Sequence, residues 1–292
     1  MADKIATREA YGNALAELGD KYDFVVLDAD LAAATKTGVF KKKFPNRFFD
    51  CGIAEGNMVT VAAGIATTGK TVFASSFAMF AAGRAFEQVR NAIGYPHLNV
   101  KIGATHAGIS VGEDGATHQC NEDIALMRAI PNMTVICPAD ANETRAAVHA
   151  IAAYEGPVYL RLGRVPVETV TDFPDYQFTI GKSVTLREGT DLTIIATGMV
   201  VADALAAAEE LKPLPADAAF LGELSLTGAL RPVTGVLPMA LCAARLGIRQ
   251  LFVPAQNAPE ATLAQGITVY PVENIAQLVA QGKTIGLPRM LP

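Results

Sequence analysis

Residues 70–105 read KTVFASSFAMFAAGRAFEQVRNAIGYPHLNVKIGAT. Short apolar runs at 70–74 and 100–105 enclose an Ala-rich segment at 80–93 whose apolar residues follow helical spacing. Two buried strands joined by one helix are typical of a β-α-β unit with parallel strands. The segment therefore predicts a parallel sheet that is covered by helices.

The same alternation extends outward, from residue 5 to about residue 165. It predicts a doubly wound, mostly parallel α/β domain over residues 1–168. The expected strands are 24–27, 70–74, 100–105, 133–137 and 158–160. The expected helices are 6–19, 57–68, 80–93, 122–130 and 141–154.

In such a sheet, ligands bind beyond the carboxyl ends of the strands. Polar residues collect directly after the expected strands, namely Asp28, Asp30, Ser75, Ser76, Thr105, His106 and Asp140. These positions are therefore the first candidates for a binding site.

Composition excludes several classes of protein. The 292 residues are 51% hydrophobic and 18% charged, which predicts one or two globular domains. A net charge of −5 gives no basic excess, so nucleic acid is not an expected partner. The first residues carry acids and no apolar stretch, so a signal peptide is not expected. No uncharged apolar run reaches the roughly 20 residues of a membrane span. The four cysteines form no CxxC pair, which favours reduced thiols in a cytoplasmic protein.

Beyond the first domain the chain changes character twice. Residues 169–190 form a linker that is rich in Thr, Asp and Pro at its start. Residues 191–212 predict the strand 191–196 and the helix 200–212, which would open a second α/β unit. Closely spaced Gly and Pro then mark residues 213–280 as a further segment, and residues 281–292 remain unassigned.

Three segments carry candidate chemistry. GIAEGNM at 52–58 places Glu55 at a helix start, where an acid can also serve only to stabilise the helix end. Phe77 and Phe80 lie three residues apart, which is also the spacing of core residues on one helix face. A Gly-rich loop at 105–119 holds His106 and His118, which could bind metal or act as a base with its orienting partner, but no third metal ligand has suitable spacing.

Together, GIAEGNM, SSFAMFAAGRAFEQVRNAI and GEDGATHQ resemble the thiamine diphosphate enzymes of the transketolase family, from residue 5 to about residue 212. The resemblance is closest to split transketolases, whose N- and C-terminal sections are separate chains. It implies the pyrimidine-binding domain of the thiamine diphosphate fold, followed by a truncated α/β C-terminal unit. The implied reaction moves a two-carbon ketol unit from a ketose phosphate to an aldose phosphate.

The resemblance also implies roles for single residues. Glu55 matches the glutamate that hydrogen-bonds N1′ of the cofactor's aminopyrimidine, and Phe77 and Phe80 match the aromatic pocket around that ring. The catalytic loop histidines correspond to His106 and His118, which also face the substrate. The remaining matches are Asp114 for a sugar hydroxyl, Arg164 and Arg8 for phosphate, and Asp30 near the thiazolium. A surface salt bridge is the alternative role for either arginine, while His97 and His149 match no family site and are expected to be structural.

Two features depart from the family. No Gly-Asp-Gly motif for magnesium and diphosphate occurs, so a separate N-terminal subunit is expected to bind both and to form an α2β2 assembly. Residues 213–280 instead resemble part of the Lon-protease-like domain of magnesium-chelatase-type AAA ATPases. The chain is therefore expected to be a chimaera of two families. A phosphate-binding P-loop is absent from the sequence, so ATPase activity is not implied.

Three alternatives stay open from the sequence. The domain also occurs in 1-deoxyxylulose-5-phosphate synthase and in the β subunits of 2-oxo acid dehydrogenases. The third is a non-catalytic fusion remnant or binding protein, because the C-terminal unit is truncated and the tail differs.

Overall fold

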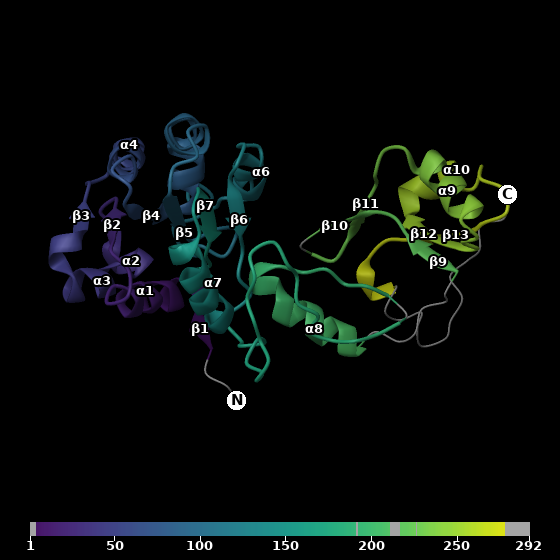
Figure 1. The fold of residues 1–292 in the computed structure, drawn as a ribbon. Coiled ribbons are helices and arrows are strands. Elements are labelled where there is room, and N and C mark those ends of the chain that lie inside the picture. The colour runs from purple at the N-terminus through teal and green to yellow at the C-terminus, as the bar shows by residue number, and fades with distance from the viewer. Residues whose placement is uncertain (1–3, 191, 211–216, 226, 278–292) are drawn as a thin grey trace. The chain divides into compact units, whose positions relative to one another are not determined.

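The computed structural model describes residues 4–190, 192–210, 217–225 and 227–277 (Figure 1). The chain forms two compact units. The first consists of Met1–Glu188 with Ile195–Leu205, and the second of Gly189–Ile194 with Ala206–Pro292.

A six-stranded parallel sheet forms the centre of the first unit, which confirms the predicted doubly wound fold. Its strands follow the order β3 (Phe48–Asp50), β2 (Phe24–Asp28), β4 (Thr71–Phe77), β5 (Val100–Thr105), β7 (Val158–Arg161) and β6 (Thr134–Ile136). All five predicted strands are present, and β5 has the predicted bounds. The sixth strand, β3, was missed because its three residues are too few for a recognisable apolar run.

The predicted helices are also present, with one change of type. The α-helices are α1 (Thr7–Leu18), α2 (Ala32–Thr35), α3 (Gly38–Lys43), α4 (Glu55–Ala66), α5 (Phe86–Gln88), α6 (Asp123–Arg128) and α7 (Ala141–Ala153), with a 3₁₀ turn η1 (Pro45–Arg47). The segment expected as one helix at 80–93 instead contains two π-helical stretches around α5, η2 (Met79–Arg84) and η3 (Val89–Gly94). Such stretches are rare and occur frequently at functional sites.

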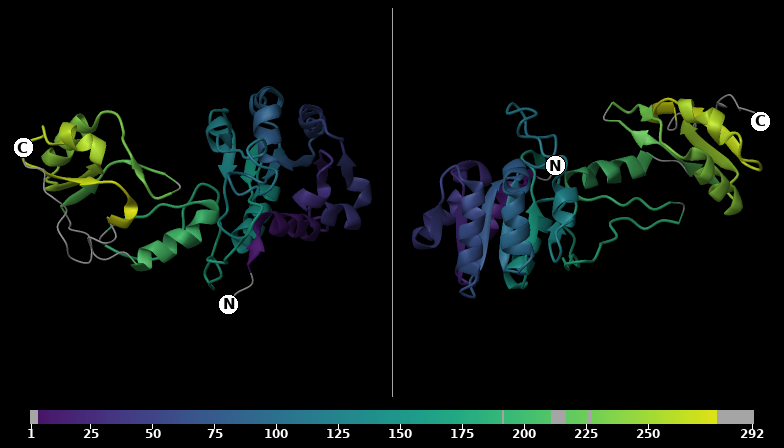
Figure 2. Two further views of the ribbon diagram at one scale, coloured as in Figure 1. Left: turned by 180° about the vertical axis from the view of Figure 1, so that it is seen from behind. Right: turned by 90° about the horizontal axis from the view of Figure 1, so that it is seen from above.

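Helices cover both faces of the sheet (Figures 1 and 2). Alternate residues of β2 lie in different cores, as the period of a strand requires: Val25 and Leu27 in one, Phe24 and Val26 in the other. On one face α1 packs against α3 and α7, and on the other α4 and α6 pack against the η2–η3 segment. A short antiparallel pair, β1 (Ile5–Ala6) with β8 (Pro166–Val167), joins the two ends of this domain.

The strand order places a topological switch point beside β2. From β2 the chain moves to β3 on one side and then returns to β4 on the other. In open α/β sheets, ligands bind in the crevice outside the carboxyl ends of the strands at such a point. Asp28, Glu55 and Phe77 follow or end these three strands.

The start of the predicted linker is fixed to the first unit. Asp140 caps α7 by accepting from the Glu143 amide at 2.8 Å, and it also accepts from the amides of Val170 and Thr171 at 2.6 and 2.8 Å. Phe178 packs against the adjacent core. Asp140 was a candidate for ligand binding, but these contacts give it a structural role.

The predicted strand 191–196 is wrong where the structure describes it, because residues 192–197 form no strand. Ile195 is 92% exposed, so the side chain of this apolar residue packs in no core. Residue 191 lies outside the described residues. The chain continues through a 3₁₀ turn η4 (Gly198–Val200) and α8 (Val201–Glu210), close to the predicted helix, whose last residues are not described.

The second unit is also built from α-helices and β-strands. Its parallel sheet has the order β13 (Thr268–Val272), β12 (Gln250–Pro254) and β9 (Ala218–Phe220). It also contains the antiparallel pair β10 (Glu223–Leu224) and β11 (Leu230–Arg231), with α9 (Val236–Arg245), η5 (Ala255–Asn257) and α10 (Ala258–Ala261). Val236, Ala240, Leu251 and Val253 form part of its own core. Residues 281–292 lie outside the described residues.

Candidate active site

Glu55 is buried at the start of α4, with 1% of its side chain exposed. Ala54, and not Glu55, occupies the N-cap position, and no side chain caps this helix. The carboxylate instead accepts a hydrogen bond at its Oε2 from Nη1 of Arg84 at 2.9 Å. Capping therefore does not explain this acid, and its position at the switch point favours a functional role.

Phe77 and Phe80 lie beside this ion pair. Their rings are stacked, with centroids 5.8 Å apart and an interplanar angle of 15°. The Arg84 guanidinium carbon lies 4.4 Å from the centroid of Phe80. One guanidinium thus contacts both the buried carboxylate and the aromatic pair, which brings the first two candidate segments together.

The two loop histidines join the same aromatic group. The His106 ring stacks on Phe77 with centroids 3.9 Å apart. His118 packs edge-on against Phe80 at 5.2 Å and against Phe77 at 6.1 Å. These four rings, from two segments that are distant in the sequence, form the ring cluster of the candidate site.

His106 is held as a neutral imidazole. It is 3% exposed, and its Nε2 lies 3.3 Å from Nη1 of Arg8. Burial, together with the charges of Arg8 and Arg164, lowers the pKa of His106 to about 4. Near neutral pH the ring can therefore donate or accept a hydrogen bond without carrying charge.

Two arginines place positive charge near His106, and Arg8 also contacts it. Arg8 of α1 also donates to the Ala34 carbonyl at 2.9 Å. Arg164 forms an ion pair with Glu113 at 3.4 Å and donates to the Val111 carbonyl. Glu113 is 88% exposed, so this surface salt bridge is weak and the guanidinium can exchange it for an anionic ligand.

Asp114 and Asp30 complete the predicted set. Asp114 is exposed in the same loop, and its charge partly offsets the effect of the arginines on the His106 pKa. Asp30 is exposed and has a positive φ of 61°, which its amide supports by donating to Asp50 Oδ1 at 3.0 Å. His97 and His149 lie elsewhere, before β5 and on α7 respectively.

Asp28, and not Asp30, is the buried carboxylate at the end of β2. It accepts hydrogen bonds from the hydroxyls of Thr35 and Thr37 at 2.7 Å each and from the Leu31 amide at 2.7 Å. This turn carries the Ala34 carbonyl that holds Arg8. Burial raises the pKa of Asp28 to about 6 even though these hydrogen bonds oppose the shift.

Asp28 and His106 should give folding stability opposite pH dependences. The pKa of Asp28 rises from 3.8 to about 6, so its contribution is lost as pH rises through that window. The pKa of His106 falls from 6.5 to about 4, so its contribution is lost as pH falls through that window. The difference in Tm between Asp28→Asn and wild type should therefore become more positive as pH rises from 4 to 6. The corresponding difference for His106→Asn should become more negative over the same range. Tm differences that do not change with pH would contradict both shifts.

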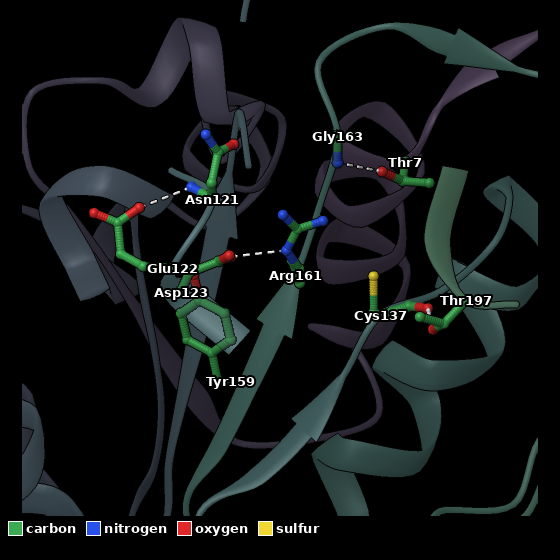
Figure 3. A network of polar contacts seen from close by, with 9 residues as sticks. All are labelled: Thr7, Asn121, Glu122, Asp123, Cys137, Tyr159, Arg161, Gly163 and Thr197. Atoms are coloured by element: carbon green, nitrogen blue, oxygen red, sulfur yellow. Dashed lines mark hydrogen bonds and ion pairs between the residues drawn. The ribbon is translucent and has the colours of Figure 1, made fainter. Parts of the chain in front are cut away.

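A buried network supports the histidine loop (residues 106–120). This loop is closed by the Gly108 amide, which donates to the Cys120 carbonyl at 2.8 Å. Just beyond it, Asp123 Oδ2 accepts from Arg161 Nε at 2.8 Å and from the Tyr159 hydroxyl at 3.0 Å (Figure 3). Although burial opposes the shift, the carboxylate of Asp123 and the Cys137 thiol together raise the pKa of Arg161. Sequence analysis missed this network, because its members lie on different elements and none belongs to a recognised motif.

The first domain of the chain matches a known protein family. Residues 3–168 match the model of the transketolase pyrimidine-binding domain. The chain belongs to the transketolase family. This family depends on thiamine diphosphate, as the resemblance implied. A second model, subunit ChlI of Mg-chelatase, matches residues 185–257, which overlaps the expected tail but begins before residue 213.

Relatives of this transketolase-family chain include separately encoded subunits. It is 58% identical over 207 residues to a transketolase C-terminal section from Methanocaldococcus jannaschii, covering 70% of this chain and 66% of the relative. It is 47% identical over 205 residues to the 6-deoxy-6-sulfo-D-fructose transketolase subunit SqwH from a Clostridium species, covering 70% and 63%. The chain thus spans just under two thirds of the length of these relatives.

A solved structure extends the likeness. The split gene transketolase, described as an inactive β4 tetramer, shares 43% identity and a TM-score of 0.65, covering 98% of this chain and 88% of that one. In the part of this transketolase-family chain that the structure describes, no helix is long and apolar enough to cross a membrane. Nor do three His, Cys, Asp or Glu side chains gather as a metal site among those residues.

The residues at the switch point fit the pyrimidine end of thiamine diphosphate. A flat heteroaromatic ring needs aromatic faces, which Phe77 and Phe80 offer. A ring nitrogen needs a hydrogen-bonding partner shielded from water, which the Glu55 carboxylate supplies at 1% exposure. The Arg84 guanidinium contacts both Glu55 and Phe80, so these two groups are neighbours.

Proposed function

We propose that this chain is the C-terminal subunit of a split transketolase, transferring a two-carbon ketol unit from a ketose phosphate to an aldose phosphate. The observation that carries the proposal is the buried Glu55 carboxylate next to the ring cluster, at the carboxyl ends of β2, β3 and β4. Bound thiamine diphosphate would supply the carbanion chemistry that protein side chains lack.

The chain's own residues would bind the ring, exchange protons and orient the sugar. Phe77 and Phe80 would hold the pyrimidine, and Glu55 would share the proton at its N1′ atom. His106, kept neutral by burial and by Arg8, would donate to or accept from a sugar oxygen, with His118 and Asp114 facing other hydroxyls. Asp30, at the rim, would lie near the thiazolium.

A second subunit would complete the site. The sequence contains no Gly-Asp-Gly motif, so we assign magnesium and the diphosphate group to an N-terminal subunit in an α2β2 assembly. The solved relative that forms a β4 tetramer is inactive, which supports the need for such a partner. The cysteines Cys51, Cys120, Cys137 and Cys242 are free, in keeping with the cytoplasmic location that we propose.

Arg164 and Arg8 would bind the terminal anion of the sugar. Replacing Arg164 with Met should raise the KM for a phosphorylated ketose about 10- to 100-fold, since a charged hydrogen bond contributes about 1.5–3 kcal/mol. The KM for a ketose without phosphate should change little. Arg145→Met is the matched control, because Arg145 forms an exposed ion pair with Glu17. Equal effects of Arg164→Met on both sugars would contradict the assignment.

The test of the proposed function is ketol transfer from xylulose 5-phosphate to ribose 5-phosphate with thiamine diphosphate and magnesium. The source genome's subunit with Gly-Asp-Gly is the partner to use. We expect turnover from the mixture and none from either chain alone. Turnover of pyruvate but not of xylulose 5-phosphate would overturn the proposal in favour of the deoxyxylulose phosphate or 2-oxo acid enzymes. No turnover from a folded mixture would favour a non-catalytic remnant.

A further inference from the structure

We propose that Arg84 is the positioning residue for Glu55: it holds one carboxylate oxygen and leaves the other for the pyrimidine. This inference rests on the proposed function, because it assumes that Glu55 meets the ring of the cofactor. Nothing in the composition of η2 marks Arg84 in this way. The assignment comes from the contacts of its guanidinium.

The guanidinium is fixed from two sides. Its Nη1 donates to Glu55 Oε2 at 2.9 Å, and its carbon lies 4.4 Å from the Phe80 ring centroid. A guanidinium over an aromatic face gains a cation–π attraction, which restricts its rotation. The π-helical turn η2 carries both Phe80 and Arg84, so one segment presents the ring and the cation together.

The carboxylate is held by a single oxygen. Among the residues that the structure describes, Oε1 of Glu55 receives no hydrogen bond, whereas Oε2 receives the one from Arg84. The Glu55 side chain is 1% exposed and that of Arg84 is 53% exposed. Burying a carboxylate in this way is costly unless it is paired and hydrogen-bonded. Arg84 therefore both orients Glu55 and compensates its charge.

Arg84 has one alternative role, which predicts a different effect of its removal on cofactor binding. A planar cation that lies on Phe80 and pairs with Glu55 resembles a bound aminopyrimidine, so Arg84 could instead be a placeholder that the cofactor displaces. A placeholder competes with the ligand, and its removal would tighten binding. We commit to positioning because Oε1 is left free and displacement would break a charge-assisted hydrogen bond to a buried group.

The experiment compares Arg84→Met, Arg84→Lys and wild type, each assembled with the N-terminal subunit. Arg90→Met is the matched control, because Arg90 lies on the same helical segment but is exposed, and its guanidinium donates to the neighbouring Asn91 side chain. Calorimetric titration with thiamine diphosphate and magnesium gives the cofactor Kd. Near-ultraviolet circular dichroism of the bound cofactor reports the state of its pyrimidine, and ketol transfer at saturating cofactor gives kcat.

We expect Arg84→Met to change the dichroism band and lower kcat at least tenfold, with a cofactor Kd within a few-fold of wild type. Arg84→Lys should recover much of both signals, and Arg90→Met should match wild type. Tighter cofactor binding by Arg84→Met would overturn positioning in favour of displacement, and an unchanged band with unchanged kcat would overturn it outright.

If the wild-type assembly binds cofactor without turnover, the proposed reaction fails, while the dichroism band still decides the role of Arg84. If wild type binds no cofactor, both fail.

Discussion

Glu55→Gln should lower kcat for ketol transfer by about 10³-fold, within the range of about 10²- to 10⁴-fold for loss of a general acid or base. The amide keeps the shape of the side chain and can still pair with one partner, but it cannot exchange a proton with N1′. Because the amide has the same shape and the Arg84 side chain is 53% exposed to water, the fold should tolerate this isosteric change. Steady-state kinetics of the assembled subunits at saturating cofactor measure the effect.

The control for this substitution is Glu168→Gln, which removes an acid that is 59% exposed and pairs with Lys4. It should leave kcat unchanged. Activity of Glu55→Gln within a few-fold of wild type would show that this carboxylate takes no part in proton exchange. A variant that fails to assemble is recognised by its sedimentation, separately from its kinetics.

Arg161→Met should lower the free energy of unfolding of the first unit by about 3–5 kcal/mol, the typical cost of removing one partner of a buried ion pair. Among the described residues, the variant leaves the fully buried Asp123 carboxylate with the Tyr159 hydroxyl as its remaining side-chain donor. Oδ1 of Asp123 already lacks a hydrogen-bond partner, so the carboxylate has no alternative donor close by. Urea unfolding followed by circular dichroism measures the change.

Two further variants sharpen this test. Arg145→Met removes an exposed ion pair with Glu17 and should cost no more than about 1 kcal/mol. Adding Asp123→Asn to Arg161→Met should recover part of the loss, because the orphaned charge disappears. Equal costs for Arg161→Met and Arg145→Met would mean that the Asp123–Arg161 pair contributes no more than a surface contact.

The fold was predictable because buried parallel strands are short apolar runs separated by helices. Chain segments 24–27, 100–105 and 158–160 therefore stand out in the sequence, and the structure confirms them. Strand β3 does not stand out, since three residues give no periodicity. The run 192–196 has the composition of a strand but none of the hydrogen-bonded neighbours that make one, and sequence composition does not report such neighbours.

The sequence predicted which residues belong to the candidate site better than it predicted the contacts between them. Motifs located Glu55, Phe77 and His106, and the structure brings Glu55 beside Phe80 through Arg84 and stacks His106 on Phe77. Arg84 was missed because an arginine within a helix is usually a solvated residue. Asp28 was predicted as one of several polar residues at the ends of the strands and was given no role of its own, because the burial that distinguishes it from Asp30 depends on tertiary packing.

The most direct test of the central claim is calorimetric titration of thiamine diphosphate with magnesium into this chain, into the N-terminal subunit, and into their mixture. We predict saturable binding of one cofactor per copy of this chain in the mixture, at least tenfold tighter than to either chain alone. Phe80→Ala should weaken it by about 1 kcal/mol or more, as expected for loss of an aromatic contact. Binding by the mixture that is no tighter than by the N-terminal subunit alone would contradict the claim that this chain supplies the pyrimidine half of the site.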